Sequence, residues 1–237
     1  LRYGAVENIW GQLSWLWSQP MIFAFAIPVL GIAGDIIPVS SGVTQRQYRI
    51  QQIAIGAMGA LSFGAFAQPF FNPDVADQAV FVTMGILVLV PILVFMGGLA
   101  DTSIRGNLSF SAHLVLSVVG MLALLVAAAA SAFHVSGPAI GAIQEINDSW
   151  LDGLITWLRD VHGTVMATAV MEHVLIASVI GVVAGLYYWS PKIFGYQLNR
   201  NVGALSAITL LGGLVLSGGS NIITVSYTHL RAHETSL

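Results

Sequence analysis

Long apolar stretches separated by short polar connections dominate this chain of 237 residues. Six of the stretches reach the roughly 20 residues that a helix needs to cross a bilayer. A span surrounded by lipid has to satisfy its own backbone hydrogen bonds, which favours helices. The pattern therefore predicts an all-α, polytopic transmembrane helix bundle with spans near residues 13–37, 50–71, 79–99, 109–134, 163–189 and 202–225.

Glycines and prolines inside these spans modify the prediction. Glycines such as Gly97 and Gly181 recur along the apolar stretches, and small residues allow helices to approach closely in a membrane bundle. Pro28, Pro69 and Pro91 also lie within spans. Because proline removes a backbone hydrogen bond, we expect each of them to kink or break its helix.

The connection at residues 135–161 is longer than a turn between two spans requires. Its segment IQEINDSWLDGLITWLRDVH has apolar residues that tend to one side of a helix. We expect an amphipathic helix that lies in the membrane interface, with Trp150 and Trp157 as anchors. A soluble cap over the bundle is the alternative.

The composition agrees with a membrane protein and excludes several other classes. Hydrophobic residues make up 56% of the chain and charged residues only 8%, whereas a soluble domain carries about 25% charged residues. The net charge of −3 gives no reason to expect nucleic acid as a partner. The sequence contains no cysteine, so it offers no thiolate metal site and no iron–sulfur cluster. Membrane lipid is the partner that the composition predicts.

Basic residues concentrate in alternate connections between the spans. Arg46 and Arg49 follow the first span, Arg105 follows the third, and Lys192 and Arg200 follow the fifth. Positive residues mark the cytoplasmic side of a membrane protein. We therefore expect an integral protein of a bacterial-type cytoplasmic membrane, with the N-terminus of this chain outside.

The two ends of the chain differ from the rest. The sequence begins at Leu1 without methionine, and residues 226–237 read SYTHLRAHETSL, an abrupt change to polar sequence. This tail resembles translated sequencing-adapter read-through, so we expect a membrane domain at 1–225, a non-native tail at 226–237 and a chain that is a fragment. Alternatively, His229, His233 and Glu234 have a spacing that suits a metal on a helix.

Two blocks of sequence carry a family resemblance. The stretch WLWSQPMIFAFAIP at 15–28 and the stretch AGLYYWSPKIFGYQLN at 184–199 resemble segments of subunit I of the haem-copper oxidases, or cytochrome c oxidases. Residues at the family's offsets in and after the first block are Trp15, Pro20, Pro28, Gly31, Ile32, Ile36, Ser41 and Gly42. The resemblance extends over about residues 10–225 and matches helices six to eleven of that family.

The resemblance implies a function and a set of partners. Members of the family reduce oxygen to water in aerobic respiratory electron transport and couple this reaction to proton pumping. The resemblance therefore implies haem as a cofactor, other oxidase subunits as partners and cytochrome c as electron donor.

The positions that bind copper in the family carry other residues here. The copper-binding histidine, the glutamate of a proton path and the cross-linked tyrosine of helix six fall at Gln19, Met21 and Phe23. The paired copper-binding histidines of helix seven fall at Gln68 and Pro69. Glutamine is a poor copper ligand, methionine cannot carry a proton and phenylalanine lacks the hydroxyl. We expect no active-site copper.

The proton-path and haem positions of the family also map onto this chain. The lysine of the second proton path falls at about Leu93. Alignment without gaps places the two haem-binding histidines of helix ten at Ala169 and Met171, and a slip of two residues brings His173 to the low-spin position instead. Methionine and histidine can both bind haem iron, so both Met171 and His173 are haem candidates.

Two acidic residues in the spans are candidates for a polar path. Glu172 lies in the middle of the fifth span, where ionisable residues are expensive and often functional. The alternative is that Glu172 and His173 form a buried polar pair without a role in chemistry. Asp35 near the end of the first span either begins a polar path or reaches the headgroups.

Three functions remain open at this point. The first is a subunit I-like oxidase fragment, and the second is a non-catalytic structural or assembly paralogue that keeps the fold. The third is a multi-span transporter that uses Glu172 and His173. If the resemblance is right, Gln19, Gln68 and Pro69 surround one small space between helices.

Overall fold

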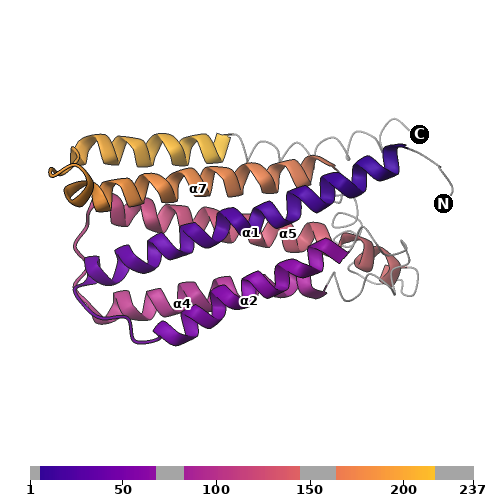
Figure 1. The fold of residues 1–237 in the computed structure, drawn as a ribbon, viewed down its shortest axis with the longest axis horizontal. Helices are drawn as coiled ribbons and strands as arrows, with labels where there is room; N and C mark the ends of the chain where they lie inside the picture. The colour runs from indigo at the N-terminus through magenta and orange to yellow at the C-terminus, as the bar shows by residue number, and fades with distance from the viewer. Residues whose placement is uncertain (1–5, 68–82, 145–163, 217–237) are drawn as a thin grey trace.

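The computed structural model describes residues 6–67, 83–144 and 164–216, and the description includes side chains at 24–62, 83–132 and 170–216. Every long element in these ranges is a helix (Figure 1). The labelled helices are α1 (Val6–Ser41), α2 (Tyr48–Ala67), α4 (Leu89–Arg105), α5 (Ala112–Gln144) and α7 (Thr164–Ile193), and an unlabelled helix, Arg200–Leu216, follows α7.

Helix α1 lies at the centre of the bundle and contacts α2, α4, α5 and α7. The helices run side by side along the long axis of the molecule (Figure 1). The buried residues of α1 recur at intervals of three and four, the spacing of one helical face; they are Ala26, Val29, Leu30, Ala33, Ile36 and Ile37. The described structure is therefore the all-α polytopic membrane bundle that the apolar pattern predicts.

Four helices in the described part of the chain are long and apolar enough to cross a membrane. They are Ala24–Ser41, Thr83–Arg105, Ala112–Ala132 and Val170–Ile193. Helix α2 and the helix Arg200–Leu216 occupy the positions of the other two predicted spans. Helix α5 continues to Gln144, ten residues beyond the predicted end at 134, so the start of the connection 135–161 is helical. The predicted amphipathic segment lies mostly outside the described residues.

The prolines affect their helices differently. Helix α1 continues through Pro28 without a break. A turn at Val88 precedes α4, and Pro91 is the third residue of that helix. The first backbone N–H groups of a helix have no partner within it, so the missing N–H of Pro91 costs little there. The predicted interruption at Pro91 is confirmed, the helix is unbroken at Pro28, and Pro69 lies outside the described residues.

Glycine and serine bring α7 close to its neighbours. A Cβ atom on Gly181 would lie 3.1 Å from Cγ2 and 3.4 Å from Cα of Val29 on α1. A Cβ atom on Gly120 of α5 would lie 3.4 Å from the carbonyl oxygen of Ala177 on α7. The hydroxyl of Ser178 donates to the carbonyl of Phe25 on α1 over 3.3 Å. These contacts form the tight junction between α1, α5 and α7, as small residues commonly do in membranes.

The three basic connections meet at one end of the bundle (Figure 1). The N–H of Asn107 donates to the carbonyl of Ser41 over 3.1 Å, and the N–H of Ser109 donates to the carbonyl of Ser40 over 2.9 Å. The Arg200 guanidinium donates to the carbonyl of Phe110 over 3.2 Å. We call the end of the bundle where these three connections meet the basic end. The structure thus places Arg46, Arg49, Arg105, Lys192 and Arg200 together, while the membrane side that they face stays a prediction.

The chain leaves α1 at the basic end through a left-handed glycine. Gly42 has φ +68°, a value that glycine adopts without steric cost. The N–H of Gly42 donates to the carbonyl of Val39 over 3.2 Å, and the N–H of Val43 donates to that of Pro38 over 3.3 Å. This pair of bonds is the Schellman ending of a helix. The Ser41–Gly42 pair therefore has a structural role at this position, because it ends α1 and turns the chain.

Candidate functional site

His173 is buried in the wall of an apolar pocket between α5, α7 and the helix Arg200–Leu216. The pocket has a volume of about 410 Å³, and only 5% of the His173 surface is exposed. The other lining residues that the structure describes are all apolar: Val119, Leu122, Ala123 and Val126 from α5, and Leu211, Leu214 and Val215 from the last helix. An apolar pocket with one convergent polar group is typical of a ligand-binding site.

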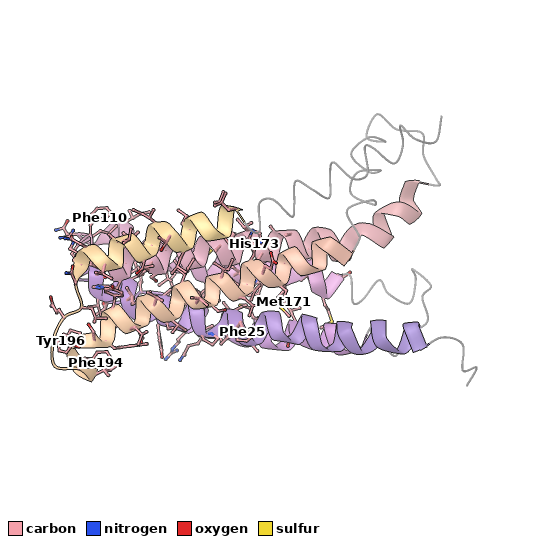
Figure 2. The ribbon with its side chains drawn as sticks, turned by 90° about the horizontal axis from the view of Figure 1, so that it is seen from above. Phe25, Phe110, Met171, His173, Phe194 and Tyr196 are labelled. Carbon is pink, nitrogen blue, oxygen red and sulfur yellow. The ribbon has the colours of Figure 1, made fainter. Side chains whose placement is uncertain are left out.

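The helix geometry separates the two haem candidates. Met171 and His173 are two residues apart on α7, a rotation of about 200° around the helix axis. Figure 2 shows Met171 on the side of α7 nearer to Phe25 of α1, whereas His173 lies on the side of the last helix. Met171 is half-buried and is not part of the His173 pocket. The two side chains therefore cannot serve the same pocket.

The positions matched to copper ligands lie partly outside what the structure describes. Gln19, Met21 and Phe23 belong to the continuous helix α1, but their side chains are outside the described set. Gln68 and Pro69 lie outside the described residues. That Gln19, Gln68 and Pro69 surround one space between helices stays a prediction.

The remaining candidates differ in their exposure. Leu93, at the position of the proton-path lysine, is 48% exposed on α4, and its neighbour Val90 is 51% exposed. Asp35 is exposed near the end of α1, and Glu172 is half-buried on α7. In the described part of the chain, no group of three or more His, Asp or Glu side chains could hold a metal ion. Leu93, Asp35 and Glu172 do not line the His173 pocket, although Glu172 directly precedes His173 on α7.

The sequence did not predict two contacts between helices, that of Gln51 with Phe95 and that of His113 with Tyr188. Gln51 of α2 is 2% exposed and its side-chain amide donates to the carbonyl of Phe95 over 3.5 Å, next to Gly98 of α4. His113 packs edge-on against Tyr188, with ring centroids 5.6 Å apart. The adjacent tyrosines at the end of α7 were the available signal for the second contact, since aromatic residues gather where spans end.

Comparison with known proteins gives a consistent group of relatives, although no protein-family model matches the chain. The chain is 25% identical over 227 residues to cytochrome c oxidase subunit 1 of Bacillus subtilis, covering 90% of this chain and 32% of that protein. It is 23% identical over 210 residues to heme-copper oxidase subunit I+III of Aeropyrum pernix, covering 86% of this chain and 23% of that protein.

A quinol oxidase subunit 1 of Bacillus subtilis is also similar, with 22% identity over 206 residues that cover 86% of this chain and 29% of that protein. The chain thus spans about a third or less of the length of the curated relatives it matches. Similarity to heme-copper oxidase subunit I proteins extends over most of the chain, in agreement with the two blocks at 15–28 and 184–199.

Proposed function

We propose that this chain is part of an oxidase subunit I-like membrane protein that lacks the active-site copper. The relatives carry the names of cytochrome c and quinol oxidase subunits, and they match nearly the whole chain. The apolar helices and their common basic end support the same scaffold. In this proposal, the protein takes part in aerobic respiratory electron transport together with other oxidase subunits and with cytochrome c as electron donor.

The observation that carries the proposal is the joint replacement of the copper ligands within a preserved framework. Gln19, Gln68 and Pro69 stand where the family has histidines. Copper in nitrogen and oxygen sites favours imidazole ligands, and neither an amide nor a proline ring offers an equivalent donor. Because all three ligand positions are replaced, we propose that the whole copper site is lost and not just one of its ligands.

The His173 pocket would suit haem, and His173 is the residue that would bind the haem iron. The imidazole is buried and its surroundings are apolar, which is the combination of ligand and pocket that haem proteins use. Apolar residues of α5 and the last helix would exclude water from the face of the group. When bound, haem supplies one-electron redox chemistry through its iron. Met171 is the alternative ligand, on the other side of α7.

Reduced-minus-oxidised absorption spectra of the full-length protein test this proposal. We expect haem bands that do not change when carbon monoxide is added, because carbon monoxide requires an open position on the iron and the family's high-spin ligand position is Ala169 here. A carbon-monoxide-reactive haem would oppose the proposal, and the absence of any haem would exclude electron transfer by this protein.

The same joint replacement favours a second function, a non-catalytic paralogue that keeps the fold as a structural or assembly subunit. Met21, Phe23 and Leu93 replace the groups that carry protons or stabilise the oxygen-reducing site in the family. Such a paralogue would copurify with oxidase subunits and would show neither haem bands nor oxygen reduction. The spectra described above therefore separate the two functions.

A further inference from the structure

A second pocket, at the basic end, lies where the start of α5, the end of α7 and the start of the helix Arg200–Leu216 meet. Its volume is about 380 Å³. This pocket is distinct from the His173 pocket, and neither Met171 nor His173 is among the described residues that line it. The residues that matter for its chemistry are His113, Tyr187, Tyr188, Gln197 and Arg200.

The side chains of this pocket are suited to an anion. The exposed guanidinium of Arg200 lies at the pocket and donates to the carbonyl of Phe110, an acceptor that carries no formal charge. Arg105, by contrast, pairs with Asp101 over 3.2 Å. No carboxylate is among the described residues that line the pocket. Arginine binds phosphate oxygens with two parallel hydrogen bonds, which gives both affinity and orientation.

The half-buried walls supply further hydrogen-bond donors. His113, Tyr187 and Tyr188 line the pocket and are partly shielded from solvent. Tyrosine hydroxyls and imidazole N–H groups can donate to phosphate. Two helices also begin at this pocket, α5 at Ala112 and the last helix at Arg200. The positive ends of their dipoles favour an anion at the same place.

The rim of the pocket is apolar and aromatic, which indicates a ligand that enters from lipid. Val39 and Phe110 line the pocket and are 63% and 73% exposed. Phe194 and Tyr196 are also exposed on the connection that follows α7 (Figure 2). Exposed aromatic residues at the ends of spans mark the headgroup level of a bilayer. A basic pocket between helices at that level is the site that an anionic headgroup requires.

We propose that the pocket lined by Arg200, His113 and Tyr188 binds the phosphate of an anionic phospholipid from the leaflet at the basic end. Arg200 is the only arginine or lysine among the described residues that line the pocket. The attraction therefore depends on Arg200. This inference does not rest on the proposed electron-transfer function, since it uses a different pocket.

Native mass spectrometry of the full chain in detergent tests the inference by counting bound lipid during titration with phosphatidylglycerol or phosphatidylcholine. We expect one phosphatidylglycerol to bind more tightly than phosphatidylcholine. Arg200→Gln should weaken that site about tenfold, as expected for the loss of a charge-assisted phosphate contact. Arg46→Gln removes an equal charge at the same end but outside the pocket. The affinity of this variant for phosphatidylglycerol should therefore stay within about twofold of that of the unchanged chain.

A further variant keeps the test independent of folding. Arg200→Lys preserves the charge and should retain most of the binding. Equal losses in the Arg200→Gln and Arg46→Gln variants, or equal affinity for the two lipids, would overturn the inference. Displacement of phosphatidylglycerol by millimolar inorganic phosphate would also overturn it, by assigning the pocket to a soluble anion.

Discussion

Replacing Gly181 with leucine is expected to lower the free energy of unfolding by about 3 kcal/mol, the upper part of the usual range for overpacking. Gly181 is buried where α7 meets α1, and even a Cβ atom there would press on Val29, both on its side chain and on its Cα. The remaining leucine atoms would separate α7 from α1 and weaken the bond from Ser178 to Phe25. The measurement is reversible unfolding of the full chain in mixed micelles, followed by tryptophan fluorescence.

Gly97→Leu provides the matched control for this experiment. Gly97 is a mid-helix glycine of α4, it is exposed, and a Cβ atom there would meet nothing within 4 Å. Leucine at this position should be neutral or stabilising by up to about 1 kcal/mol, because leucine has the higher helix propensity. If the two variants unfolded with the same free energy, the close approach of α7 to α1 would be wrong.

Replacing His173 with leucine is expected to abolish the haem bands of the full-length protein. The substitution removes the imidazole that the apolar pocket offers as an axial ligand but leaves an apolar side chain of comparable size. The measurement is the reduced-minus-oxidised spectrum per mole of purified chain, with circular dichroism to establish that the helices are retained.

Two further variants locate the ligand. Met171→Leu should keep the haem bands, because Met171 lies on the other side of α7 from the pocket. His113→Leu removes a histidine from the basic-end pocket and should keep them as well. Retention of haem in His173→Leu together with its loss in Met171→Leu would contradict our choice of ligand and would support the register without gaps.

The fold was largely predictable because the apolar stretches are long and the connections between them are short. Lipid leaves few alternatives to a helix, so element type follows from length and hydropathy. Helix ends were less predictable. Helix α5 continues to Gln144 although His134, Ser136 and Pro138 favour a helix end near 134. Pro28 lies in the middle of α1 and leaves it unbroken, whereas Pro91 lies in the first turn of α4. The sequence alone does not show where these two helices begin.

The candidate site was predictable only in part. His173 stood out as an ionisable residue within a span, but its partners on α5 and on the last helix are ordinary apolar residues such as Ala123 and Leu214. Nothing in their identity distinguishes a pocket wall from packing. The basic-end pocket was likewise hidden, because Arg200 and His113 lie 87 positions apart in sequence and meet only through the packing of helix ends.

The copper content of the purified full-length protein tests the central claim most directly. Elemental mass spectrometry of protein from copper-supplemented cells gives the number of copper atoms per chain. We predict no stoichiometric copper, because Gln19, Gln68 and Pro69 replace the imidazole ligands. One copper atom per chain that survives dialysis against a chelator would contradict the claim that this scaffold has lost its active-site copper.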